Sequence, residues 1–326
     1  MNKLYPLKFK PRFRDKIWGG QKIKDVLKIN FGDLPNCGEA WALSGVEDNE
    51  TVVANGFLTG NELNELVEIY MDDLVGGKVY EQYKNEFPIL VKFIDANDWL
   101  SIQVHPDNEL ARKRGLSNGK TEMWYIISSE ENSQLISGFS QTVNQKVYLD
   151  HLKNNTLQEI LNFEIVKADD IFYMPSGRVH ALGPGILLAE IQQTSDTTYR
   201  IYDWDRSDDQ GKQRDLHTNE AIEAIDYNTY NDYKTDYPHI KNQSVEAVKA
   251  PYFTTQVLHL DMPMIKSFAK IDSFIIYTCV MGKVAVKYPE GKVELNMGEC
   301  LLIPNEILSI EILPLTESKL LETYIL

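Results

Sequence analysis

The chain has 326 residues, of which 33 are Lys or Arg and 48 are Asp or Glu, so its formal net charge is −15. Such an acidic chain lacks the basic face that binds nucleic acids or anionic membrane surfaces, so neither partner is expected. Hydrophobic residues make up 43% of the sequence, which excludes a disordered or fibrous chain, and the length suits two domains or one large β domain with additions.

The cysteines and the first residues predict neither disulfides nor targeting. Cys37, Cys279 and Cys300 are widely spaced and odd in number, so no disulfide framework or thiolate zinc cluster is indicated. The first residues lack the apolar core of a signal peptide, and no run of about 18 apolar residues occurs. We therefore expect a cytoplasmic protein.

Short segments rich in Ile, Val, Tyr and Phe, separated by Gly, Pro, Asn and Asp, predict strands along the first two-thirds of the chain. These segments are residues 88–96, 100–104, 122–128, 171–174, 186–192 and 198–204. Their spacing indicates a sandwich or a barrel rather than βαβ units.

Helical patterns are confined to small insertions between these strands. The segments are residues 59–70, 142–163, where a pair of helices is expected, and 217–225. Thr59 with Glu62, and Thr156 with Glu159, have the spacing of a capping box, so we expect helices to begin at Thr59 and Thr156.

A polar segment rich in Tyr and Asn, residues 226–243, is the best candidate for a linker. After it, further short apolar segments predict a second all-β unit, with strands at 254–258, 274–280, 283–288, 292–295 and 300–303. A weak repeat relates residues 169–175 to 298–304, but only the first copy continues to a histidine. We therefore predict two domains, a catalytic metal-binding domain at 1–240 and a degenerate copy without metal ligands at 241–326.

Four polar side chains in the first unit have the spacing of a metal site. Gln103 and His105 lie two residues apart on a predicted strand and so share one face. Glu122 begins a later strand, and His180 follows a tight turn. Two imidazoles, one carboxylate and one amide oxygen would suit Zn²⁺ or another divalent first-row ion. A single His is more often structural, and this interpretation applies to His151, His217, His239 and His259.

Two sequence motifs resemble those of the cupin superfamily. Residues 175–180 match its P-x-G-x-x-H pattern, and Gln103-Val-His105 resembles a variant of its H-x-H pattern with Gln in first place. The chain departs from the family pattern at Asp169, where a Gly is usual, and Glu122 lies further along than usual. More specifically, the chain resembles the short bacterial form of type I mannose-6-phosphate isomerases at residues 18–20, 38–41, 90–92, 100–107, 119–124, 177–181 and 193–200.

The resemblance implies a fold, a metal and an activity. The fold would be mainly β, with two cupin-like jelly-roll domains and a small helical insertion. One Zn²⁺ per chain would be held by His105, Glu122 and His180, with Gln103 as a fourth ligand in many relatives. The activity would be the interconversion of mannose 6-phosphate and fructose 6-phosphate through a cis-enediolate. Lys120 falls on a lysine implicated in proton transfer, and Arg200 on the family's active-site arginine.

Several other charged or polar residues suit a lined cavity. Lys92 stands alone among apolar neighbours, and Glu190 lies on a predicted strand, where it suits an alternate acid or base or a partner of Arg200. Glu39 beside Trp41 is a candidate hydroxyl acceptor, although an exposed turn carboxylate is the simpler interpretation. The phosphate ligands stay open between Ser101, Lys92 and Arg200.

Alternatives to this interpretation are also open. From spacing alone, Arg200 could form a salt bridge with Asp196 or Asp203, and Lys120 could be a solvated charge. A non-catalytic cupin that binds a phosphosugar would need no proton shuttle, and another metal-dependent cupin enzyme, such as an iron oxygenase, would leave residues 120–124 unexplained. No Gly-rich phosphate loop precedes a helix, so no nucleotide is expected. The sequence does not predict the oligomeric state.

Overall fold

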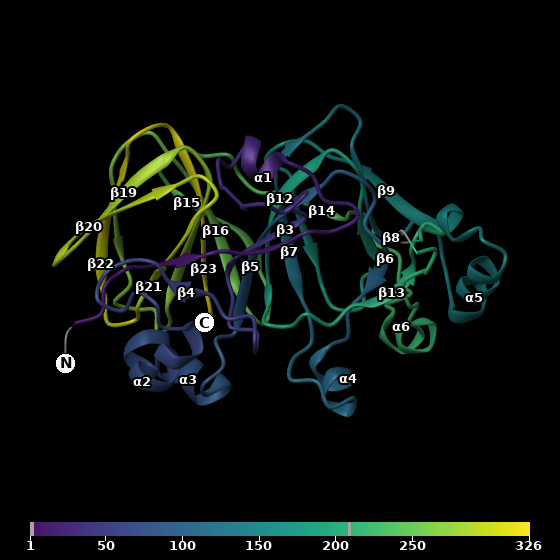
Figure 1. The fold of residues 1–326 in the computed structure, drawn as a ribbon, viewed down its shortest axis with the longest axis horizontal. Helices are drawn as coiled ribbons and strands as arrows, with labels where there is room; N and C mark the ends of the chain where they lie inside the picture. The colour runs from purple at the N-terminus through teal and green to yellow at the C-terminus, as the bar shows by residue number, and fades with distance from the viewer. Residues whose placement is uncertain (1–2, 208–209) are drawn as a thin grey trace.

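Strands and turns dominate the architecture, as the sequence pattern predicts. The computed structural model describes residues 3–207 and 210–326. In these ranges four antiparallel sheets form two β units that lie side by side (Figure 1). The prediction of a mainly β fold is confirmed.

The first unit is built from two sheets. The larger sheet has the order β14 (Lys234–Thr235), β10 (Ile171–Met174), β7 (Glu122–Ser129), β12 (Ile186–Gln193), β5 (Ile89–Ala96), β3 (Glu39–Leu43) and β2 (Arg12–Arg14). The smaller sheet has the order β13 (Tyr199–Tyr202), β6 (Ile102–Val104), β11 (His180–Leu182), β8 (Gln134–Phe139) and β9 (Leu161–Ile165). Side chains of the two sheets meet, as the 3.4 Å contact between Glu122 and His180 demonstrates, so both sheets line one interior.

The second unit also contains two sheets. One has the order β15 (Ser244–Lys249), β16 (Thr254–Leu260), β23 (Ser318–Tyr324), β18 (Ile275–Met281), β21 (Cys300–Ile303), β1 (Leu7–Lys10) and β4 (Val52–Val53). The other has the order β17 (Met264–Ser267), β22 (Ser309–Pro314), β19 (Lys283–Tyr288) and β20 (Gly291–Asn296). Strands β1 and β4 come from the N-terminal part of the chain and extend this second unit, while the division at residue 240 stays a prediction.

Strands β5 and β12 are the central feature that positions the functional residues. All their residues are buried, because one face packs on the second unit and the other faces the interior of the first unit. Val91 and Phe93 on the outer face of β5 join a cluster that includes Ile276 and Leu302 of the second unit. Lys92 therefore points the opposite way, into the first unit, since side chains alternate along a strand.

Short helices lie outside the sheets (Figure 1): α1 (Lys22–Asp25), α2 (Leu63–Val75), α3 (Gly77–Tyr83), α4 (Asn108–Lys113), α5 (Gln145–Lys153) and α6 (Thr218–Ala224). The predicted start at Thr59 is wrong, because Glu62 caps α2 and forms the capping box with Glu65. The Thr59 hydroxyl instead donates to the Gly56 carbonyl at 2.8 Å, within the preceding turn.

The predicted helical pair at 142–163 is found as α5 and a 3-10 turn at Leu157–Ile160. Asn144 caps α5. Thr156 is the N-cap residue of the 3-10 turn, as its predicted start requires, but its side chain makes no capping hydrogen bond to the described residues, so the second predicted capping box is wrong. The predicted helix at 217–225 is found as α6. Among the described helices, none has the length and hydropathy needed to cross a membrane.

Candidate metal centre and its cavity

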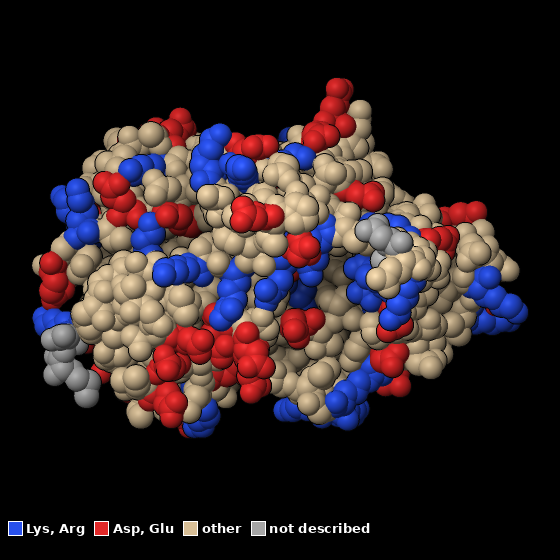
Figure 2. Space-filling model, viewed as in Figure 1, with Lys and Arg blue, Asp and Glu red and all other residues tan. Residues whose placement is uncertain are grey.

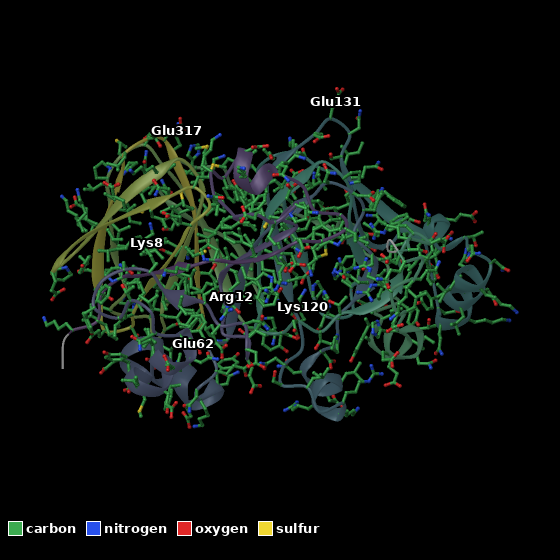
Figure 3. All side chains as sticks on the ribbon, in the orientation of Figure 1. Lys8, Arg12, Glu62, Lys120, Glu131 and Glu317 are labelled. Atoms are coloured by element: carbon green, nitrogen blue, oxygen red, sulfur yellow. The ribbon has the colours of Figure 1, made fainter. Side chains whose placement is uncertain are left out.

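A polar cavity opens at the interior of the first unit. Lys and Arg side chains border a hollow near the middle of the visible face (Figure 2), and Lys120 lies at this place (Figure 3). The predicted catalytic and substrate-binding residues all line this cavity: Glu39, Lys92, Ser101, Lys120, Glu190 and Arg200.

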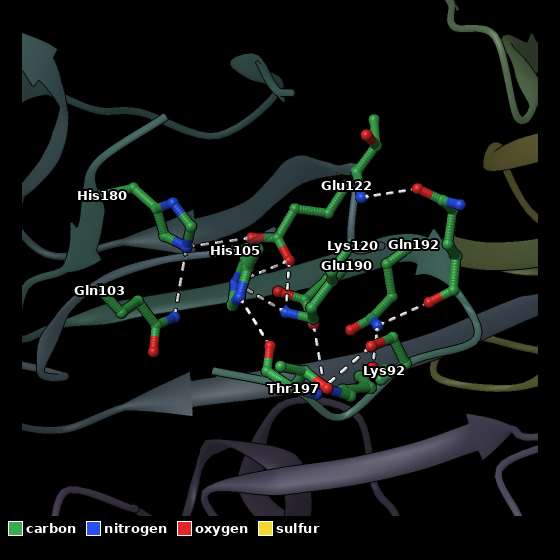
Figure 4. Close-up of polar contacts among 12 residues, drawn as sticks. Lys92, Gln103, His105, Lys120, Glu122, His180, Glu190, Gln192 and Thr197 are labelled. Atoms are coloured by element: carbon green, nitrogen blue, oxygen red, sulfur yellow. Dashed lines mark hydrogen bonds and ion pairs between the residues drawn. The ribbon is translucent and has the colours of Figure 1, made fainter. Parts of the chain in front are cut away.

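The predicted metal ligands come from strands of both sheets. Gln103 lies on β6 directly opposite His180, the first residue of β11, and His105 immediately follows β6. Glu122 is the first residue of β7 in the facing sheet. Residues that are far apart in the sequence thus point toward one another across the interior (Figure 4).

The side chains of His105, Glu122 and His180 converge closely enough to hold one ion. His105 Nε2 lies 3.6 Å from Glu122 Oε2, and His180 Nε2 lies 3.4 Å from Glu122 Oε1. The two imidazole centroids are 4.8 Å apart, and all three residues are buried. The Gln103 amide nitrogen lies 3.2 Å from His180 Nε2. Because the amide oxygen and nitrogen can exchange places by a rotation, this side chain can also present its oxygen.

Backbone carbonyls set the orientation of both imidazoles. His105 Nδ1 donates to the Thr197 carbonyl at 2.9 Å, and His180 Nδ1 donates to the Arg178 carbonyl at 2.8 Å. This leaves the Nε2 lone pair of each ring facing the cluster, as metal ligation requires. Burial, and then the charge of Lys120, lower the pKa of His180 to about 3 and that of His105 well below its usual value, so both rings are neutral.

The two oxygens of the buried Glu122 carboxylate differ in their hydrogen bonding. Oε2 accepts a hydrogen bond from Lys120 Nζ at 2.5 Å, whereas the buried Oε1 has no hydrogen-bond partner within the described part of the chain. Burial and the neighbouring Glu190 raise the pKa of Glu122, so a cation beside the carboxylate would favour its ionised form. Two imidazole nitrogens and an unpaired carboxylate oxygen therefore fit a divalent first-row ion.

A row of buried opposite charges extends from the cluster along the larger sheet. Glu190 lies opposite Lys92 on β5 and Trp124 on β7, so the three side chains share one face. Its carboxylate is 3.2 Å from Lys92 Nζ and 4.0 Å from Lys120 Nζ, and it accepts from Trp124 Nε1 at 2.9 Å. Burial opposes the ionised form, but the two ammonium groups outweigh it and lower the pKa of Glu190.

Arg200 lies on β13 at the mouth of the cavity. Its Nη1 donates to the Asp215 carbonyl at 2.8 Å, and its buried Nε has no hydrogen-bond partner in residues 3–207 and 210–326. No carboxylate of the described ranges lies within 4.0 Å of its guanidinium, so the alternative of a salt bridge is not found there. Asp203 instead pairs with Arg206 and Arg214.

The two remaining predicted residues differ in environment. Ser101 is buried, and Glu39 is held on β3 rather than in an exposed turn. Glu39 accepts from Trp41 Nε1 at 2.7 Å and lies 3.3 Å from Lys16 Nζ. Sequence reasoning did not single out several further residues that line the cavity, among them Lys16, Trp18 and Arg214. Arg214 had no local signal, because its partner Asp203 lies eleven residues earlier, beyond a polar stretch of sequence.

Comparisons with known proteins identify the family. Residues 6–131 match the family described as phosphomannose isomerase type I, catalytic domain. The chain is 33% identical over 308 residues to mannose-6-phosphate isomerase of Streptococcus mutans, covering 93% of this chain and 94% of that protein. It is 41% identical over 226 residues to mannose-6-phosphate isomerase ManA of Bacillus subtilis, covering 68% of each chain.

Solved structures agree on the fold. The crystal structure of mannose 6-phosphate isomerase from Bacillus subtilis superposes with a TM-score of 0.87 at 30% identity, covering 98% of this chain and 99% of that one. A structure from Archaeoglobus fulgidus has a TM-score of 0.78 at 18% identity and supports the fold alone. The resemblance stated from the sequence motifs and the predicted cupin-type fold are both confirmed.

Proposed function

The chain belongs to the type I phosphomannose isomerase family and is an aldose–ketose isomerase, and we propose that it interconverts mannose 6-phosphate and fructose 6-phosphate through a cis-enediolate, with one zinc ion at His105, Glu122 and His180. The observation that carries the zinc assignment is the convergence of two Nε2 lone pairs on a carboxylate whose buried Oε1 has no hydrogen-bond partner where the chain is described. Gln103, beside His180 Nε2, completes the proposed ligand set.

The proposed ion and the side chains have separate tasks. When bound, a zinc ion supplies a Lewis acid that polarises the sugar oxygens at C1 and C2. The protein must then move one proton from C2 of the aldose to C1 of the ketose, while the hydroxyl proton at O2 passes to O1. It must also hold the sugar so that both carbons face the same acid–base group.

Lys120 is the proposed proton shuttle. Its Nζ lies in the cavity, 2.5 Å from Glu122 Oε2 and 3.0 Å from His105 Nε2, so it reaches the place where the reacting carbons must lie. In its amine form Lys120 takes the proton from C2, and the resulting ammonium returns it to C1. Glu190, 4.0 Å away, holds the charged form in place and is the proposed alternate acid–base group.

Arg200 is the proposed anion-binding residue at the cavity mouth. It has a buried Nε without a partner, no carboxylate within 4.0 Å among the described residues, and Arg214 beside it in the cavity lining. A phosphate or a sugar oxyanion could accept hydrogen bonds from the planar guanidinium of Arg200. Ser101 is a second candidate for binding the phosphate, whereas Lys92 is already paired with Glu190. Glu39 is proposed to accept a hydrogen bond from a sugar hydroxyl.

The second unit is proposed to support the first rather than to bind metal. Its interior is filled by apolar side chains such as Ile275, Val284 and Leu301. The domain division at residues 1–240 and 241–326, and the cytoplasmic location, stay predictions of the sequence.

A coupled assay with mannose 6-phosphate tests the proposal. Chelation should abolish turnover, and zinc should restore it. Full turnover in chelated, metal-free protein would refute the role of the metal. Restoration by iron but not by zinc would refute the assignment of zinc while leaving the isomerase activity intact.

A further inference from the structure

The loop segment at residues 193–197, which starts at the last residue of β12 and leads toward β13, passes beside His105; residues 193–195 are buried, and Asp196 is exposed. Its last residue, Thr197, provides the carbonyl that accepts the hydrogen bond from His105 Nδ1 at 2.9 Å (Figure 4). This carbonyl decides which nitrogen of His105 carries the proton, and so which nitrogen faces the proposed ion. The shape of the loop therefore controls one of the ligands.

Gln192 holds this loop from the inside of the larger sheet. It is fully buried on β12, directly opposite Glu122 on β7. Its Nε2 donates to the Gln193 carbonyl at 2.8 Å and to the Ser195 carbonyl at 2.7 Å. The Ser195 hydroxyl in turn accepts from the Thr197 amide at 3.3 Å. Three hydrogen bonds thus link Gln192 to Ser195, Ser195 to Thr197, and Thr197 to His105.

The orientation of the Gln192 amide is determined by these contacts. Two carbonyl oxygens face its nitrogen, so a rotated amide would place its own oxygen against them. Its Oε1 is buried and has no hydrogen-bond partner among the described residues. The side chain therefore acts in the fold as a donor to the loop, and a substitution that removes the donor removes all of its hydrogen bonds.

We propose that Gln192 is a positioning residue: its amide holds residues 193–197 in the shape that presents the Thr197 carbonyl to His105, and so sets the affinity for the metal. The inference rests on the proposed function, because it assumes that His105 binds an ion. Removing a group that orients a metal ligand without touching the metal itself typically lowers metal affinity by about 10–100-fold.

The first test measures zinc affinity by competition with a chelator. Gln192→Met keeps the length of the side chain and removes both donors, and it should weaken zinc binding by about 10–100-fold relative to the wild type. Gln256→Met is the matched control, because Gln256 donates to the Tyr324 hydroxyl at 3.1 Å in the second unit, and its zinc affinity should equal that of the wild type. Equal affinity of Gln192→Met and wild type would overturn the inference, whereas a wild type that binds no zinc would refute the proposed function instead.

A second readout needs no metal. In protein labelled with ¹⁵N-histidine, the Nδ1 proton of His105 should exchange with solvent faster in Gln192→Met. The Nδ1 proton of His180, held by the Arg178 carbonyl, should not change and is the internal reference. If Gln192→Met does not fold, Ser195→Ala, which cuts the link to the Thr197 amide, should give the same selective change. Equal changes at both protons, or none at either, would overturn the inference.

Discussion

Glu190→Gln is expected to destabilise the protein strongly, because Glu190 is the counterion of a buried lysine. Glu190 lies 3.2 Å from Lys92 and 4.0 Å from Lys120, and the side chains of Lys92 and Glu190 are 8% and 4% exposed. A glutamine keeps the shape and can still accept from Trp124, but it leaves Lys92 over the ring of Trp41, at 5.0 Å, without its nearest carboxylate. Removing one partner of a buried pair costs about 3–5 kcal/mol, a large share of a typical stability of about 5–15 kcal/mol.

Urea unfolding with a chelator present measures this loss without a contribution from bound metal. We expect Glu190→Gln to lower the free energy of unfolding by about 3–5 kcal/mol, and Glu190→Gln combined with Lys92→Met to recover part of it. Glu311→Gln is the matched control, because Glu311 pairs with Lys287 at 3.0 Å on the exposed surface and should cost about 0–1 kcal/mol. If Glu190→Gln lowers the free energy of unfolding by less than about 1 kcal/mol, as for an exposed pair, Glu190 is not the stabilising counterion of buried Lys92.

Three further predictions concern the reaction. His180→Ala should lose bound zinc and turnover together, as metal analysis and the coupled assay would measure; retained zinc would contradict its role as a ligand. Arg200→Ala should keep zinc while kcat/KM for mannose 6-phosphate falls by about 10²–10³-fold, the typical effect of removing one preorganised donor; an unchanged kcat/KM would remove Arg200 from the site. Lys120→Met should stop the exchange of deuterium from solvent into C1 of fructose 6-phosphate, as NMR would detect; continued exchange would identify another proton shuttle.

Much of the fold could be predicted because turn residues mark the strand ends. Strands β10, β19 and β21 begin and end at the predicted residues, since Asp170, Pro175, Gly282 and Pro304 interrupt the apolar segments beside them. Helix starts were harder, because several residues in one segment can cap. Thr59 has the right spacing, but a tight turn already uses its hydroxyl.

The candidate site could be predicted in part for a similar reason. His105, Glu122 and His180 lie at strand ends, where spacing along the chain indicates which side chains face inward. The partners of the charged residues could not be predicted, because they depend on strand order. Lys92 and Glu190 meet only because β5 and β12 are neighbours in the sheet. The addition of β1 to the second unit likewise depends on a pairing with a strand near the other end of the chain.

The most direct test of the central claim is a crystal structure of the zinc-loaded protein with anomalous diffraction recorded on both sides of the zinc absorption edge. The account predicts one strong anomalous peak per chain, bounded by Nε2 of His105, Nε2 of His180 and the carboxylate of Glu122. An anomalous peak elsewhere in the chain, or none beside these three side chains, would contradict it.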